Sequence, residues 1–267
     1  MMQIYQFILL SFIQAVTEFL PISSSGHLLF FKGIMDVVQI PLIFDVMVHA
    51  GSLVAIVFFY RKRILITCQS AINEIPKNCQ KSNVKFLGYV ILSTTITFLF
   101  YVLFKDFVES KFESPGTLTV TYLVTTIILL LTRIRTNHNT EEIIKKRWYV
   151  PFFAGLVQGL AILPGISRSG STISSLLIMD VKKEEAAYYS FFLAIPAIGG
   201  ALIFQLLELE NIQFLIDYRF EMTLSFLTSA VFSYLFLSFL VWIIRKGKLW
   251  IFAFYTFSMA VFSWILF

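Results

Sequence analysis

Five ionisable side chains lie inside stretches of sequence that are otherwise apolar, and they are the first candidates for chemistry. These residues are Glu18, His27, Asp45, His49 and Arg168. Ionisable groups at membrane depth are costly and are usually functional. Carboxylate, imidazole and guanidinium groups with serines beside them can bind a phosphate and transfer its protons. The set predicts an anion site rather than a purely structural core.

Arg168 belongs to the segment Pro-Gly-Ile-Ser-Arg-Ser-Gly-Ser-Thr at residues 164–172. If a helix begins near Ser167, its free N–H groups and positive dipole end attract an anion, and the forked guanidinium suits a phosphate. A structural alternative is an ion pair between Arg168 and Glu18. The phosphate contacts predicted beside Arg168 are Ser167, Ser169, Gly170 and Thr172.

Residues 23–27 have the sequence Ser-Ser-Ser-Gly-His, which also suits the start of a helix with serine as its N-cap. Ser24 and His27 are three residues apart, so a helix would carry both on one face. A hydroxyl beside an imidazole is a nucleophile beside a base. The alternative is that the serines only cap the helix and that His27 bonds within the bundle. The phosphate contacts predicted here are Ser23, Ser25 and Gly26.

Two more pairs have the i, i+4 spacing of one helix face. Gln14 and Glu18 form the first pair, and the carboxylate is expected to hold a cation, to orient His27 or to relay a proton. Asp45 and His49 form the second pair. They either support the site from beside it or lie near the outer end of a helix, and both alternatives stay open.

The composition of the chain is that of a polytopic membrane protein. Of its 267 residues, 58% are hydrophobic and 14% are charged, whereas soluble domains have about 25% charged residues. The mean hydropathy is +0.81. The net charge of +5 comes from basic residues between apolar runs, which indicates membrane topology rather than nucleic-acid binding. Cys68 and Cys79 are expected to be free thiols.

Six apolar stretches are long enough to cross a bilayer as helices, namely residues 42–60, 86–104, 117–131, 186–206, 222–244 and 249–267. Two further apolar regions, 4–34 and 150–179, are interrupted by Pro, Gly and Ser. Lipid cannot satisfy irregular backbone, so each region predicts two half-helices joined by a polar loop, which is a re-entrant hairpin. The predicted fold class is all-α, with six spanning helices and two re-entrant helical hairpins.

The two interrupted regions resemble each other. Gln14 precedes Gly26 by twelve residues, Gln158 precedes Gly170 by the same number, and Leu-Pro lies between them in both. A single transmembrane domain, 1–267, is therefore predicted to contain two repeats, about 1–135 and 148–267. Each repeat has one hairpin and three spans. Because three is odd, the second repeat is inverted, and the site is expected where the hairpins meet.

The basic residues test the orientation of these spans. With the first hairpin entering from outside, the outer side holds Lys32, Lys105, Lys111 and Arg219. Sixteen residues fall inside: Arg61, Lys62, Arg63, Lys77, Lys81, Lys85, Arg133, Arg135, Lys145, Lys146, Arg147, Lys182, Lys183, Arg245, Lys246 and Lys248. Cytoplasmic loops carry the excess of Lys and Arg, so both termini are expected outside.

The motifs at residues 14–27 and 164–172 resemble those of the BacA/UppP family of undecaprenyl-diphosphate phosphatases, the bacitracin-resistance proteins. Phe44-Asp45 before Gly51-Ser52, and residues 191–196, are also similar to the family pattern. The resemblance covers essentially the whole chain. It implies hydrolysis of a C55 polyprenyl diphosphate to the monophosphate and inorganic phosphate, at the outer side of a bacterial cytoplasmic membrane.

The resemblance also implies roles for individual residues. Ser24 is the expected nucleophile, His27 the acid/base, Glu18 the assisting carboxylate and Arg168 the phosphate clamp. A divalent cation, Mg²⁺ or Ca²⁺, with Glu18 as a ligand, is expected, and no organic cofactor. Gln14 occupies a position where many members carry Glu, which removes one anionic ligand. A homodimer is a further expectation.

Two questions stay open at this point. The first is whether Ser24, His27 or water attacks the phosphorus. The second is whether the same anion pocket serves a flippase or transporter of a polyprenyl phosphate, because inverted repeats with broken helices are common in transporters. The Ser24 and His27 pair favours hydrolysis, since transport does not require it.

Overall fold

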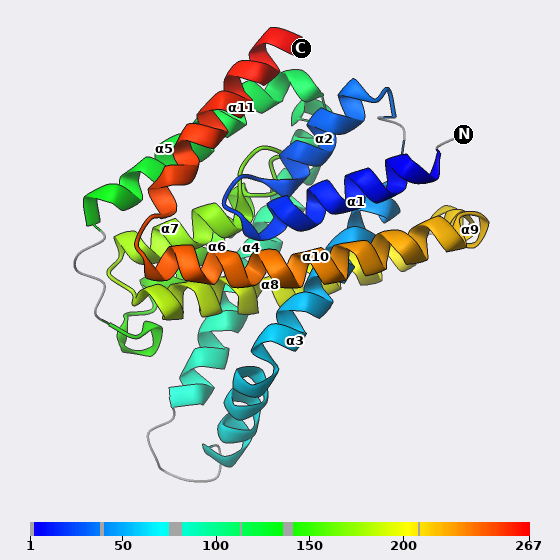
Figure 1. Cartoon of the computed structure of the whole chain (residues 1–267). Helices are drawn as coiled ribbons and strands as arrows, with labels where there is room; N and C mark the ends of the chain where they lie inside the picture. Colours follow the sequence, from blue (N-terminus) through cyan, green and yellow to red (C-terminus); the bar gives the residue numbers. More distant parts are fainter. Residues whose placement is uncertain (1–2, 38–39, 75–81, 113, 136–140, 208) are drawn as a thin grey trace.

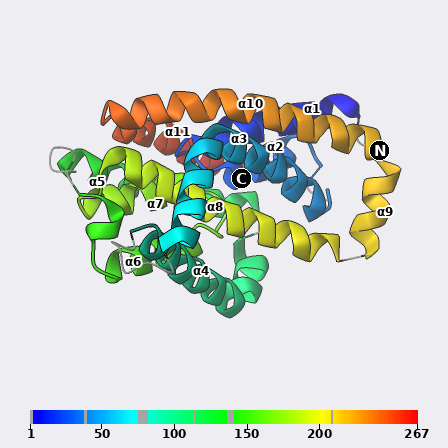
Figure 2. The same ribbon diagram turned by 90° about the horizontal axis from the view of Figure 1, so that it is seen from below.

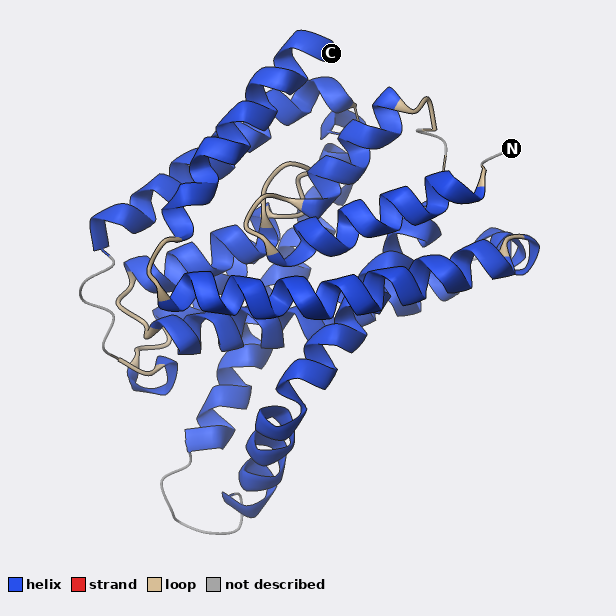
Figure 3. Cartoon of the chain, in the orientation of Figure 1, coloured by secondary structure: helices blue, strands red, loops and turns tan. Residues whose placement is uncertain are grey.

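Helices account for all the long regular elements of the described chain (Figure 3). The computed structural model describes residues 3–37, 40–74, 82–112, 114–135, 141–207 and 209–267. Within these ranges the β-type contact is one isolated bridge between Glu141 and Val181. Cys68 is a free thiol, whereas Cys79, Lys77 and Lys81 lie outside the described residues. The predicted all-α class is confirmed.

The chain has the same order of helices in its two halves. The first half contains a hairpin, α1 (Ile4–Phe19) and α2 (Ser24–Ile34), then α3 (Leu42–Glu74), α4 (Ser82–Phe112) and α5 (Leu118–Arg135). The second half contains a hairpin, α6 (Tyr149–Leu160) and α7 (Arg168–Ile178), then α8 (Lys183–Leu206), α10 (Arg219–Arg245) and α11 (Phe252–Leu266). The short elements are η1 (Pro115–Thr117), η2 (Ile143–Lys145), α9 (Leu209–Asp217) and η3 (Leu249–Ile251).

Six helices of the described chain are long and apolar enough to cross a membrane, and they correspond to the six predicted spans. They are α3, α4, α5, α8, α10 and α11. α3 extends to Glu74, well beyond the predicted end at residue 60. Its extension is stabilised at Arg63, which pairs with Glu185 and lies 3.8 Å from the Tyr188 ring centroid. Helical hydrogen bonding does not stop where the apolar stretch stops, so hydropathy underestimated the helix.

Helices of one half pack on helices of the other in matching pairs. α1 lies along α10, and in the same way α6 lies along α4. α3 packs against its counterpart α8, and α5 against its counterpart α11 (Figures 1 and 2). The extensive contact between α3 and α10 has a smaller counterpart between α4 and α8, so the correspondence is approximate. These pairs are the ones expected if a two-fold axis relates the halves.

Small side chains allow α3 and α10 to approach closely, as is common between membrane helices. Ser52 hydrogen-bonds with Ser233 over 2.7 Å and with Ser229 over 3.2 Å. A Cβ on Gly51 would lie 2.6 Å from the Phe226 carbonyl oxygen. This contact leaves α3 little freedom relative to α10, and it fixes the face of α3 from which Asp45 and His49 project.

Candidate active site

The turns of the two hairpins contact each other. Ser23, whose φ is +68°, caps α2 by accepting a hydrogen bond from the Gly26 amide. The same hydroxyl oxygen accepts from the Gly165 amide of the other turn over 3.1 Å. The Gly165 carbonyl in turn accepts from Thr125 of α5 over 2.8 Å. The irregular backbone of these turns is therefore hydrogen-bonded to groups of the protein itself.

A second contact closes the junction from the other hairpin. Ser167 caps α7 by accepting from the Gly170 amide over 3.0 Å, which repeats the cap of Ser23 on Gly26. The Ser169 hydroxyl donates to the Phe19 carbonyl over 3.1 Å. That carbonyl belongs to the last turn of α1, whose oxygens have no partner within the helix. The first turn of α7 thus supplies a hydrogen-bond donor to a carbonyl oxygen at the end of α1.

Gly26 is the tightest point of this junction. A Cβ there would lie 2.8 Å from the Cα and the nitrogen of Gly165 and 2.8 Å from the Tyr122 hydroxyl. We expect Gly26→Ala to destabilise the protein by about 1–3 kcal/mol, because overpacking against backbone is not easily relieved. Thermal unfolding in detergent measures the change. The control is Gly199→Ala, since a Cβ on Gly199 meets no atom within 4 Å; equal melting temperatures for the two variants would contradict the contact.

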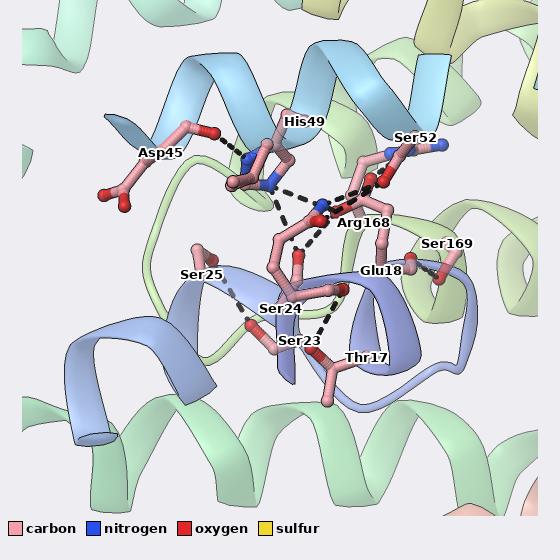
Figure 4. A network of polar contacts seen from close by, with 12 residues as sticks. Thr17, Glu18, Ser23, Ser24, Ser25, Asp45, His49, Ser52, Arg168 and Ser169 are labelled. Atoms are coloured by element: carbon pink, nitrogen blue, oxygen red, sulfur yellow. Dashed lines mark hydrogen bonds and ion pairs between the residues drawn. The ribbon is translucent and has the colours of Figure 1, made fainter. Parts of the chain in front are cut away.

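Glu18 is the centre of a polar network at the junction (Figure 4). Its Oε1 accepts from Arg168 Nη2 over 2.8 Å. Its Oε2 accepts from the Ser24 hydroxyl over 2.6 Å and lies 3.1 Å from His49 Nε2. Gln14 Nε2 also reaches Oε2, over 3.4 Å. The side chain of Glu18 is 5% exposed. The structural alternative for Arg168, an ion pair with Glu18 across the two hairpins, is therefore observed.

The imidazole beside Ser24 is that of His49 rather than that of His27. His49 Nε2 lies 3.4 Å from the Ser24 hydroxyl oxygen. His49 Nδ1 is 2.6 Å from the Asp45 carbonyl oxygen, and because a carbonyl only accepts, Nδ1 carries the hydrogen. Nε2 is then directed at Ser24 and Glu18. His49 therefore lies beside Ser24, within the first two turns of α3.

His27 has its ring nitrogens engaged elsewhere. Nδ1 lies 2.7 Å from the Ser23 carbonyl oxygen, and Nε2 lies 2.8 Å from the Tyr255 hydroxyl. The Tyr122 hydroxyl is 3.1 Å from Nδ1, and the His27 side chain is buried. The expected Ser24–His27 pair is not formed, because tyrosines of α5 and α11 bind the imidazole on its other side. His27 instead holds the carbonyl of the turn that precedes α2.

A cavity of about 670 Å³ opens at the junction. Its polar lining includes these predicted site residues: Glu18, Ser23, Ser24, Ser25, Asp45, His49, Ser167 and Arg168. Its apolar wall comes from α2, the start of α3, α4, the turn between α6 and α7, and α8, with Leu28, Val108 and Ile198 among the lining residues. The cavity therefore joins a charged end to an apolar wall, which suits a molecule with an anionic head and a hydrocarbon tail.

Six predicted site residues are absent from the described lining of this cavity: Gln14, Gly26, His27, Ser169, Gly170 and Thr172. The Thr172 hydroxyl donates to the Arg168 carbonyl over 2.7 Å and contacts the Ser190 hydroxyl. Gly170 packs against Pro21, where a Cβ would lie 3.0 Å away. These groups pack in the contact between the two turns or form hydrogen bonds at the ends of the helices. Their predicted contact with phosphate is not favoured by this geometry.

Lys32 is a cavity residue that the sequence did not reveal. The charge count places Lys32 on the outer side, and the structure adds that it lies in the last turn of α2 with its side chain 7% exposed. Its Nζ lies 2.7 Å and 2.8 Å from the two carboxylate oxygens of Asp45. A signal was present, since Lys32 follows an apolar run of α2 with no other charge.

The residues at the junction do not fit a resident divalent cation. Mg²⁺ and Ca²⁺ take several oxygen ligands. Glu18 is already shared among Arg168, Ser24 and His49, and the carboxylate of Asp45 is paired with Lys32. Among the described residues, no cluster of three or more His, Cys, Asp or Glu side chains could hold a metal ion.

The fold and the site define a multi-pass membrane protein with a charged cavity among its helices. Residues 7–262 match the family described as bacitracin resistance protein BacA, and the chain belongs to that family. An undecaprenyl-diphosphatase of Carboxydothermus hydrogenoformans is 35% identical over 97% of this chain and 96% of its own length. An undecaprenyl-diphosphatase of Methanobrevibacter smithii is 36% identical over 95% of this chain and 94% of its own length. The family resemblance noted from the motifs is confirmed.

Proposed function

We propose that this protein hydrolyses undecaprenyl diphosphate to undecaprenyl phosphate and inorganic phosphate, which recycles the carrier lipid for cell-wall synthesis. The observation that carries the proposal is the Ser24 hydroxyl, held 2.6 Å from the Glu18 carboxylate in a cavity that Arg168 also lines. The relatives named undecaprenyl-diphosphatase support the choice of substrate.

In the first step, Ser24 Oγ attacks the terminal phosphorus in line with the bridging oxygen. The bond from phosphorus to that oxygen breaks, and undecaprenyl phosphate leaves with the electron pair. The Ser24 proton passes to the carboxylate of Glu18, which already accepts its hydrogen bond. Arg168 and the N-terminal ends of α2 and α7 stabilise the charge on the transferring phosphoryl group.

In the second step, water attacks the phosphoserine. Glu18 still holds the serine proton from the first step, so a proton of that water passes to His49 Nε2, which lies 3.1 Å from the Glu18 carboxylate. The bond from phosphorus to Ser24 Oγ breaks, Ser24 regains its proton from Glu18, inorganic phosphate leaves, and His49 releases the water proton to solvent. The same groups therefore serve both steps. The sequence leaves two alternatives to Ser24 as the group that attacks phosphorus, namely His27 and water. His27 is not among the residues that line the cavity, and its Nε2 contacts Tyr255.

We expect His49→Asn to lower kcat by about 10²-fold while the protein remains folded, because positioned acid–base groups contribute about 10²–10⁴-fold.

His27→Asn is expected to lower the melting temperature as well as activity, since His27 holds the turn through Ser23 and Tyr255. Tyr255→Phe removes only the tyrosine hydroxyl and should share the stability loss of His27→Asn. A catalytic defect at His27 with unchanged melting in both of these variants would return the acid/base role to His27.

The location of the site is part of the proposal. The cavity is proposed to face the outer side of a bacterial cytoplasmic membrane, with the prenyl tail in lipid and both termini outside. The positive-inside distribution of Lys and Arg supports this orientation. The matching pairs of helices in the two halves support an inverted repeat, with α1–α2 and α6–α7 as re-entrant hairpins. Cysteine labelling from either side of the membrane tests both points.

Phosphate release from purified protein and a polyprenyl diphosphate in detergent tests the reaction. A transporter using the same pocket would bind the lipid without releasing phosphate. Release by the wild-type protein is the expected result. Folded wild-type protein that binds the lipid and releases no phosphate would favour the flippase. The homodimer stays a prediction, which the mass of the detergent-solubilised protein measures.

A further inference from the structure

Lys32, which is buried, forms an ion pair with the partly exposed Asp45, and neither residue has a role in the two hydrolytic steps. Both residues line the same cavity as Ser24 and Arg168. Among the described residues that line it, the Lys and Arg side chains are Lys32 and Arg168. Burying an ammonium group among the helices of a membrane protein is costly, and such groups are usually functional. We therefore ask what the Lys32 ammonium could bind in this cavity.

The position of Lys32 relative to the reacting serine follows from α3. Asp45 and His49 are one helical turn apart on α3, so their Cβ atoms are separated by about 6 Å. His49 contacts Ser24 and Glu18, whereas Asp45 contacts Lys32. The Lys32 ammonium group is thus bound one helical turn before the residue that contacts Ser24, and both Lys32 and Ser24 line the same cavity. A lipid diphosphate in this cavity has a second phosphate beside the one that Ser24 attacks.

The charge balance of the cavity points in the same direction. Arg168 is balanced by Glu18 in the resting state, with 2.8 Å between Nη2 and Oε1. A diphosphate brings negative charge on both of its phosphates, which is more than the single charge of one guanidinium balances. An ammonium group has three donors and is a compact point charge. Two of the Lys32 contacts go to a single carboxylate, that of Asp45, which leaves a donor for a second anion.

We infer that Lys32 binds the phosphate that remains on the lipid, while Arg168 binds the phosphate that is removed. This inference rests on the proposed function and adds the recognition of the second phosphate to it. Asp45 holds the ammonium in place through its carboxylate and is not itself a ligand of the substrate. Lys32 is thus a binding and positioning residue. A substrate whose single phosphate contacts Arg168 has no second phosphate for Lys32, so Lys32 favours a diphosphate over a monophosphate.

Steady-state kinetics of Lys32→Met tests the inference. We expect KM for the polyprenyl diphosphate to rise about 10- to 100-fold, the range of a lost charge-assisted hydrogen bond, with kcat changed by less than about threefold. Inhibition by undecaprenyl phosphate should weaken by a similar factor, and inhibition by inorganic phosphate should not change. Lys32→Arg should recover most of the affinity. The control for loss of charge is Lys111→Met, because Lys111 is exposed on α4 and absent from the cavity lining.

The variant Asp45→Asn distinguishes a role of the ion pair in binding the lipid phosphate from a role in stabilising the fold. If the ion pair only stabilised the fold, Lys32→Met and Asp45→Asn would lower the melting temperature and the activity equally, and that result would overturn the inference. We expect Asp45→Asn to bind undecaprenyl phosphate at least as tightly as the wild type, since the ammonium keeps its charge. Binding is measured directly with undecaprenyl phosphate in detergent, so the test does not require turnover. Wild-type protein without phosphate release would contradict the proposed function, whereas unchanged lipid affinity in Lys32→Met would contradict only the role of Lys32.

Discussion

Ser24→Ala is expected to reduce phosphate release from a polyprenyl diphosphate by at least about 10⁴-fold. The reason is that the hydroxyl is the group placed to attack, 2.6 Å from Glu18 and 3.4 Å from His49 Nε2. Removal of a nucleophile from a preorganised site costs factors of this size. The loss should appear in kcat, while binding of undecaprenyl phosphate, which needs no nucleophile, changes little.

The control for this variant is Ser238→Ala. Ser238 is exposed on α10 and its hydroxyl donates to the Tyr234 carbonyl of its own helix over 3.1 Å, so its loss should leave activity unchanged. Mass spectrometry of acid-quenched wild-type protein should find a phosphoryl group on Ser24. If Ser24→Ala retained activity within about tenfold of the wild type, water would be the nucleophile, with Glu18 as its base.

Local patterns in the sequence predicted the parts of this site that depend on local structure. The breaks at residues 20–23 and 161–167 follow from Pro, Gly and Ser in apolar surroundings, and the helices end and begin there. The two serine caps, Ser23 on Gly26 and Ser167 on Gly170, follow from the preference of serine for the N-cap. Caps and breaks are decided within a few residues, so one sequence was enough to predict them.

The absence of a hydrogen bond between Ser24 and His27 shows where residue spacing stops being informative. An i, i+3 relation places two Cα atoms on one face, but Ser24 is the first residue of α2, where the side chain is not confined between turns of helix. Its hydroxyl bonds to Glu18, six residues earlier, and the His27 imidazole bonds to Tyr255, 228 residues later. The contact with Tyr255 is decided by the position of α11 beside α2, which no local pattern encodes.

Lys32 was missed for a related reason. The positive-inside count treats each Lys or Arg as a loop residue unless it lies deep in an apolar stretch. Lys32 follows an apolar run by position, yet its side chain is directed into the cavity toward Asp45. Only the relative placement of α2 and α3 reveals that contact. The pairing of Arg168 with Glu18 was considered because both charges lay in interrupted regions that were expected to meet.

Arg168→Lys is expected to lower kcat/KM by about 10²- to 10³-fold although the charge is kept. The guanidinium donates to Glu18 Oε1 over 2.8 Å from one nitrogen, and its other terminal nitrogen lies 3.4 Å from the Ser190 carbonyl oxygen. The planar fork is thus held in one orientation, from which two donors can bind two oxygens of a phosphoryl group. An ammonium at the end of a flexible chain offers one point of charge and no fixed plane.

The comparison with Arg168→Ala separates charge from geometry. Alanine leaves the buried carboxylate of Glu18 without its cation, and breaking a buried ion pair costs about 3–5 kcal/mol, so this variant should also melt at a lower temperature. Lysine keeps the charge near Glu18 and should retain most of the stability while losing activity. Arg219→Lys, an exposed arginine at the start of α10, is the matched control and should behave as the wild type. Near wild-type activity of Arg168→Lys would mean that the site needs only positive charge there, and the two-oxygen contact with the departing phosphoryl group would then be wrong.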